Sequence, residues 1–163
     1  MSIGQTVFGL EPVHLHLLTN HIPIFMTLAG LIALALGVLW KIEDAKRAAL
    51  VVLILGAAGG PLTYWLGEQS YDTVRKLADD DGRAWLDAHW DRAEDVIWLY
   101  WVSLVVSLGS LVMLTRNVRR AGAAVILAGL LAAGTLGAAI WVASAGGNIR
   151  HPEVRTVAPP DDE

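Results

Sequence analysis

The chain of 163 residues is 55% hydrophobic and 17% charged, with a mean hydropathy of +0.50 and a formal net charge of −4. This composition excludes an ordinary soluble domain, indicates a protein embedded in a lipid bilayer and gives no support to nucleic acid binding. Cysteine is absent, which excludes disulfides, thiolate metal sites and covalently attached c-type haem. Any metal would therefore be held by nitrogen and oxygen ligands.

Four apolar runs predict four transmembrane helices. They comprise residues 22–40, 48–67, 96–115 and 121–146. Each run is long enough to cross a hydrocarbon core of about 30 Å as a helix that rises about 1.5 Å per residue. Because the runs follow one another closely, we expect an all-α, up-down-up-down four-helix bundle that forms one domain over residues 1–157. Only the tail, residues 158–163, is expected to be disordered.

The distribution of basic residues predicts the orientation. Half of the twelve Lys and Arg residues lie in or beside the short connections after the first and third runs: Lys41, Lys46, Arg47, Arg116, Arg119 and Arg120. The positive-inside rule makes those connections cytoplasmic and puts both termini outside. The first 21 residues lack a basic n-region and an A-x-A site, so we do not expect a removable signal peptide.

The long second connection is predicted to be folded. Residues 68–78 continue the second helix, and residues 83–95 lead helically into the third. We expect the chain to turn at residues 79–82, with Gly82 in the left-handed conformation that often ends a helix.

Small residues recur four positions apart in every run and predict close contacts between helices. These ladders are Ala29, Ala33 and Gly37; Gly56 and Gly60; Ser103 and Ser107; and Gly129, Ala133 and Gly137. Tryptophans at or beyond the outer ends of the runs predict an interfacial aromatic belt. They are Trp65, Trp85, Trp90, Trp98 and Trp141.

All five histidines fall on the predicted outer side. His14, His16 and His21 precede the first run, His89 precedes the third, and His151 follows the fourth. With Glu68 at the end of the second run, every helix then offers one potential ligand to the same zone. Histidine is the commonest metal ligand and titrates near neutrality, so the set favours a functional site over mere contact with headgroups and water.

The spacing of the first three histidines leaves their geometry open. On one continuous helix, His14 and His21 would share a face about 10 Å apart, which suits two centres better than one. Asn20 and Pro23 would instead break that helix, and His14 and His16 would point the same way if the segment were extended.

Two cofactor classes fit these residues. For b-type haem, the ligands must reach the iron from opposite faces of the porphyrin, for example His21 with His89 and His14 with His151. Arg150, with Arg83 or Arg92, would then pair with the propionates. Bound Cu, Fe or Zn without porphyrin would add carboxylates from Glu68, Asp72, Glu94 or Glu153. His14, His21, His89 and His151 are the preferred ligands, and His16 is the least constrained.

Several short segments carry a family resemblance: residues 14–16 (HLH), 20–23 (NHIP), 67–68 (GE), His89 with Ala93, and 146–155 (GGNIRHPEVR). Over nearly the whole chain they resemble a family of small uncharacterised bacterial four-helix membrane proteins. The first helix is more distantly similar to HFPI-type membrane domains of unknown function. The resemblance implies four helices and a role for His14, His16, His21, Glu68, His89, Arg150, His151 and Glu153. It implies no activity.

The leading functional hypothesis is a redox subunit of the bacterial inner membrane. It would bind b-type haem at its periplasmic face and pass electrons between a membrane or periplasmic donor and an acceptor. The alternatives are a non-haem Cu, Fe or Zn protein and a non-catalytic assembly subunit. No nucleophile–base arrangement or phosphate-binding loop occurs, so the sequence names no reaction or substrate.

Overall fold

A computed structural model describes residues 10–160, and this part of the chain contains helices and no strand. The helices are α1 (Pro12–Thr19), α2 (Ile22–Leu39), α3 (Glu43–Leu77), α4 (Asp80–Thr115), α5 (Ala121–Arg150) and the 3-10 helix η1 (Pro152–Val154). Four helical segments, with α1 and α2 counted as one, are long and apolar enough to cross a membrane. The all-α prediction is therefore confirmed. Residues 1–9, part of the segment considered for a signal peptide, and residues 161–163 of the tail lie outside the described residues.

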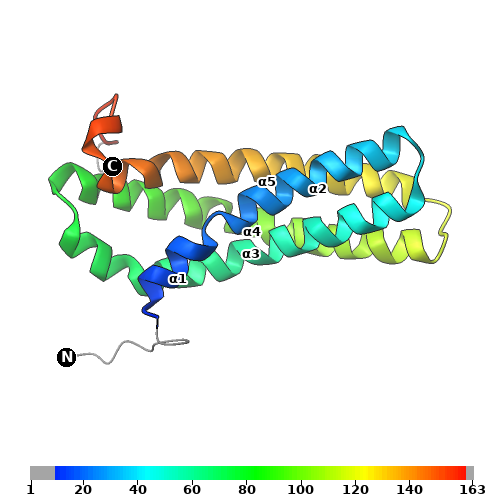
Figure 1. Cartoon of the computed structure of the whole chain (residues 1–163), viewed down its shortest axis with the longest axis horizontal. Helices are drawn as coiled ribbons and strands as arrows, with labels where there is room; N and C mark the ends of the chain where they lie inside the picture. The colour runs from blue at the N-terminus through cyan, green and yellow to red at the C-terminus, as the bar shows by residue number, and fades with distance from the viewer. Residues whose placement is uncertain (1–9, 161–163) are drawn as a thin grey trace.

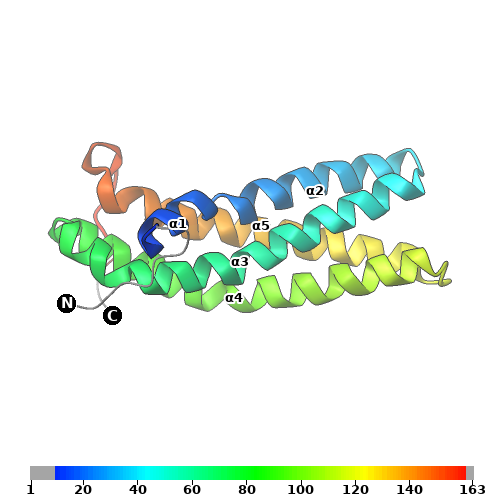
Figure 2. The same cartoon turned by 60° about the horizontal axis from the view of Figure 1, so that its bottom comes forward.

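The long helices lie side by side along one axis (Figures 1 and 2). The connections at residues 40–42 and 116–120 lie at one end, which we call the basic end after its Lys and Arg residues. The α1 helix, residues 78–79 and η1 lie at the other end, which we call the histidine end. Helix α2 packs mainly on α3, and α4 packs mainly on α5, so the fold consists of two helical hairpins.

A break between α1 and α2 resolves the geometry that the sequence left open. The α1 helix ends at Thr19, whose hydroxyl donates to the Leu15 carbonyl at 2.8 Å. Helix α2 begins at Ile22 with Pro23 in its first turn, where a missing N–H costs no helical hydrogen bond. His14 and His16 therefore belong to α1, and His21 occupies the N-cap position of α2 without a side-chain capping bond.

The α3–α4 connection is tighter than predicted. Helices α3 and α4 do extend beyond their apolar runs, as expected, but α4 already starts at Asp80. Asp79 is its N-cap, and Asp79 Oδ1 accepts a hydrogen bond from the Gly82 N–H at 2.8 Å. The predicted left-handed cap at Gly82 is wrong, because Gly82 lies inside the first helical turn.

Small residues do bring helices together at most of the predicted positions. A Cβ on Gly56 would lie 2.7 Å from Thr27 Oγ1, and a Cβ on Gly60 would overlap the ring of Tyr100. Among the described residues, by contrast, no atom lies within 4 Å of a Cβ built on Gly137. Ala29 of the first ladder and Ala133 and Gly137 of the fourth are exposed, so the prediction is wrong for these three residues.

The bundle contains two clusters of buried apolar residues, and the smaller one lies at the histidine end, mostly beyond the apolar runs. It consists of Ala78, Trp85, Leu86, Ala145 and Ile149. Trp85 is only 4% exposed, so the belt interpretation is wrong for this residue, whereas Trp65, Trp98 and Trp141 are exposed as a belt requires. This cluster holds the outer turns of α4 and α5 together.

Candidate functional site

His16 lies in a notch on α3. Its Nδ1 is 3.0 Å from the Thr63 carbonyl oxygen. Its ring packs against Gly67, one turn further along α3, where a Cβ would come within 3.1 Å of the ring atom Cε1. A carbonyl oxygen only accepts, so Nδ1 must carry the proton and Nε2 must carry the lone pair.

His89 repeats this arrangement in the second hairpin. Its Nδ1 is 2.9 Å from the Val142 carbonyl oxygen of α5. A Cβ on Gly146, one turn after Val142, would lie 3.1 Å from both Nδ1 and Cε1 of the ring. Each hairpin thus combines a histidine, a carbonyl acceptor and a glycine four residues after that acceptor.

Both histidines are half-buried and lie outside the four apolar runs. Burial lowers the pKa of His16, the hydrogen bond to Thr63 opposes this shift, and the nearby charge of His89 lowers the pKa further. Burial also lowers the pKa of His89; its bond to Val142 opposes the shift and Arg92 adds to it. Both lowered pKa values favour the neutral imidazole, which is the form that binds metals.

The other histidines are exposed and lack a backbone carbonyl partner in the described part of the chain. His14 is exposed on α1, and His21 is exposed and stacks on Phe25 with 6.0 Å between ring centroids. His151 is exposed and its Nδ1 lies 2.9 Å from Glu153 Oε1. Within residues 10–160 no three His, Cys, Asp or Glu side chains, including the exposed Glu68, form a group able to hold a metal ion.

The arginines considered for propionates all have protein partners. Arg92 Nη1 donates to the Trp141 carbonyl and to Ser144 Oγ, each at 3.1 Å, and its guanidinium lies 4.9 Å from the centre of the Trp141 ring. Arg83 pairs with Asp80 at 3.2 Å. Of these arginines, Arg92 is the one whose charge acts on His89.

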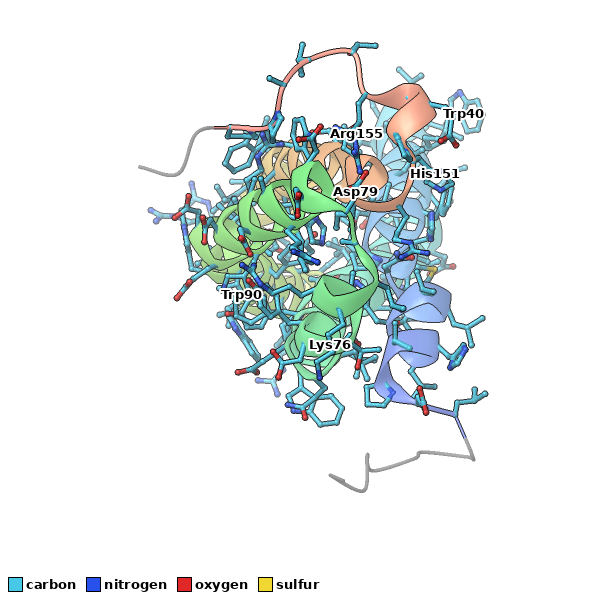
Figure 3. All side chains as sticks on the ribbon, turned by 90° about the vertical axis from the view of Figure 1, so that its left-hand side faces the viewer. Trp40, Lys76, Asp79, Trp90, His151 and Arg155 are labelled. Atoms are coloured by element: carbon cyan, nitrogen blue, oxygen red, sulfur yellow. The ribbon has the colours of Figure 1, made fainter. Side chains whose placement is uncertain are left out.

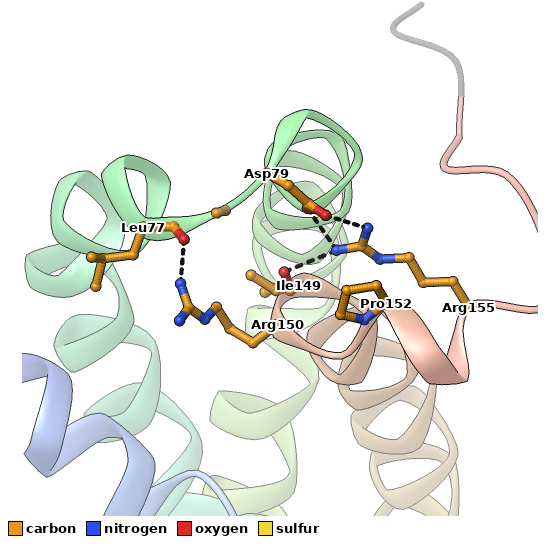
Figure 4. A pocket seen from close by; sticks show the side chains of 7 residues that line it. Leu77, Asp79, Ile149, Arg150, Pro152 and Arg155 are labelled. Carbon is orange, nitrogen blue, oxygen red and sulfur yellow. Dashed lines mark hydrogen bonds and ion pairs between the residues drawn. The ribbon is translucent and has the colours of Figure 1, made fainter.

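Arg150 and Arg155 link the C-terminal end of the chain to the α3–α4 connection (Figure 4), and Figure 3 shows Arg155 beside Asp79. Arg150 donates to the Leu77 carbonyl. Arg155 donates to both carboxylate oxygens of Asp79 at 2.8 Å and to the Ile149 carbonyl at 3.2 Å. We call these five residues the C-terminal clasp. These bonds hold the C-terminal end of the chain against the α3–α4 connection.

Sequence reasoning missed a cluster of aromatic and charged residues beside His89. Trp90 contacts Tyr64 and Tyr71, with ring centroids 5.5 and 5.6 Å apart. Tyr71 donates to Asp87, which also pairs with Arg75 at 2.6 Å and thereby raises the pKa of Arg75. The helical spacing of these residues on α3 and α4 was the available signal. The cluster fixes α4, and therefore His89, against α3.

Among the described residues, His16 and His89 are the two histidines whose Nδ1 is held by a backbone carbonyl of a neighbouring helix, one in each hairpin. Comparisons with protein-family models, curated proteins and solved structures find no match.

Proposed function

We propose that the protein is a membrane redox subunit that binds b-type haem between His16 and His89. The observation that carries the proposal is the pair itself: two neutral imidazoles, one from each hairpin, each held by Nδ1 on a backbone carbonyl. Such a bond to the second ring nitrogen is what orients metal-binding histidines and raises their basicity. Haem, when bound, would supply a centre that gains and loses one electron.

The residues fit a two-ligand centre better than a bare metal site. A b-type haem would need only two imidazole nitrogens from the protein, and no hydrogen bond to a described residue occupies Nε2 of His16 or His89. A Cu, Fe or Zn site usually takes three or more protein ligands. The proposed pair therefore replaces the pairing of His21 with His89 and of His14 with His151.

The surrounding residues have separate roles in this proposal. Thr63 and Val142 hold the Nδ1 protons, while Gly67 and Gly146 leave room for the rings. Arg92, which is held beside His89, would pair with a propionate. Arg150 would instead act through the C-terminal clasp, since it binds the Leu77 carbonyl.

We further propose an up-down-up-down crossing of the bacterial inner membrane with both termini and the histidine end in the periplasm. The concentration of Lys and Arg at the basic end supports a cytoplasmic position for that end. The haem would then exchange electrons with a membrane or periplasmic partner.

The absorption spectrum of the purified protein tests the proposal. After expression with ample haem, we expect a Soret band and, on reduction, the visible bands of a six-coordinate b-type haem. A wild-type protein without a Soret band would exclude haem. Elemental analysis of that protein would then distinguish a bound transition metal from none.

A non-catalytic assembly subunit is the second candidate, because the same contacts also join helices. His16 bonds α1 to α3, and His89 bonds α4 to α5. In that case neither haem nor metal copurifies. Replacement of either histidine by glutamine, which also donates a hydrogen bond, would then leave folding and assembly intact.

A further inference from the structure

A row of buried hydroxyls lies on one face of α4 between the two ends of the bundle. Ser103, Ser107 and Ser110 are 3%, 1% and 1% exposed, and four and three residues separate them. Residues with these separations lie on the same helix face. The row therefore faces the interior of the bundle rather than lipid.

Two of these serines have protein partners, and the direction of each bond can be assigned. Thr135 donates its one hydroxyl proton to the Leu131 carbonyl at 2.9 Å. The contact of 2.7 Å between Ser103 and Thr135 must then be a bond that Ser103 donates. Ser110 donates to the Val106 or Ala124 carbonyl, at 2.7 and 2.9 Å. The oxygens of Ser103 and Ser110 both keep lone pairs that no described residue fills.

Ser107 is the exception in the row. Its Oγ is buried and makes no hydrogen bond with any residue of the described chain. A buried hydroxyl without a partner is costly in protein and in lipid alike. Helical serines commonly bond the carbonyl four residues earlier, as Ser110 does with Val106, but no such bond forms at Ser107.

We propose that Ser107 binds a water molecule inside the bundle, and that this water donates to Ser110. Residues three apart rise about 4.5 Å along a helix. A water with two hydrogen bonds of about 2.8 Å spans up to about 5.6 Å, so one molecule bridges the two oxygens. Ser107 donates to the water and Ser110 accepts from it, which gives every group a partner and the water two bonds.

The facing helix presents small side chains at this level. Ser103 contacts Thr135 and Ser110 contacts Ala124, so Ser107 faces the stretch of α5 between those two residues. The buried side chains of that stretch include Ala128 and Ala132, which carry only a methyl group. The water site lies inside the apolar runs, away from the His16–His89 pair, and it stands whether or not haem binds.

The thermal unfolding of Ser107→Ala in detergent tests this site, with Ser103→Ala as the matched control. Both serines are buried on one face of α4, but Ser103 has a protein partner. We expect both variants to lower Tm by about 2–4 °C, because each loses about one hydrogen bond. An unchanged or raised Tm for Ser107→Ala would overturn the proposal, since removal of an unpaired hydroxyl relieves a cost.

A second measurement needs no variant. Water-edited solid-state NMR of the serine-labelled protein in bilayers reports which side chains contact water. We expect early magnetisation transfer from water to Ser107. Transfer absent from Ser107, while it reaches the exposed Ser144, would contradict the water site.

Discussion

At the scale of single residues, two adjacent glycines in α5 test whether the space beside Gly146 positions the His89 ring. A Cβ on Gly146 would come within 3.1 Å of the His89 ring, whereas a Cβ on Gly147 meets no described atom within 4 Å. Both substitutions by alanine improve helix propensity by about 0.5–1 kcal/mol.

We therefore expect Gly146→Ala to lower haem content several-fold and Gly147→Ala to leave it unchanged, as measured by the Soret absorbance per chain. Gly147→Ala should also raise Tm slightly. Equal haem content in the two variants would show that the space beside Gly146 does not position the His89 ring.

The buried histidines predict a pH dependence of stability. Burial lowers the pKa of His16 and His89 in the folded state, while the unfolded chain keeps values near 6.5. Below pH 6.5 the unfolded state therefore binds more protons, and stability falls as the pH drops from 6.5 through the lowered folded values. Thermal melts of the haem-free protein between pH 7.5 and 5 should show this loss.

The double variant His16→Gln, His89→Gln is the control for that experiment. It cannot titrate at these positions, so its Tm should fall less over the same range. Parallel profiles for the variant and the wild type would assign the pH dependence to other groups.

At the scale of helices, the Asp79 carboxylate has two structural roles. It caps α4 and pairs with Arg155, and the Arg155 guanidinium, followed by the Gly82 N–H, lowers the pKa of Asp79 to about 2. Asp79→Asn keeps a good cap but loses the charge pair, whereas Asp79→Ala loses both.

We expect Tm to fall most for Asp79→Ala, less for Asp79→Asn, and by almost nothing for Asp80→Asn. Asp80 is the matched control, because it forms an exposed pair with Arg83. An Asp79→Asn variant as stable as wild type would mean that the C-terminal clasp contributes nothing to stability.

The extents of the long helices could be predicted from the sequence because apolar runs and helix-forming flanks are local signals. The sequence predicts a turn that ends at Gly82, whereas α4 starts at Asp80. Glycine often ends a helix and aspartate often starts one, so the local sequence fits both positions of the turn. The break at Asn20 was undecided for a similar reason: both a continuous and a broken helix satisfied the local pattern.

The site was harder to predict than the helices. His16 is the least constrained ligand in the sequence, because its ring bonds to Thr63, which lies 47 residues away. The residues next to His16 do not indicate this contact. The exposed His21 and His151 are preferred as ligands in the sequence only because they lie at the ends of apolar runs. Only tertiary packing distinguishes a half-buried histidine with a fixed tautomer from one that is exposed.

At the scale of the whole molecule, the orientation is open to a direct test because the chain has no cysteine. We expect Asp72→Cys, at the histidine end, to react with a membrane-impermeant maleimide in cells whose outer membrane is permeable. Asp44→Cys, at the basic end, should react only after lysis. The reverse pattern would invert the proposed orientation.

The central claim is that each hairpin supplies one histidine to a shared haem centre. It is tested most directly by the haem content of His16→Ala and His89→Ala, with the exposed His14→Ala and His151→Ala as controls. We predict that either of the first two substitutions abolishes the six-coordinate spectrum and that both controls retain it. Full haem content in His16→Ala or His89→Ala, or its loss in a control, would contradict the account.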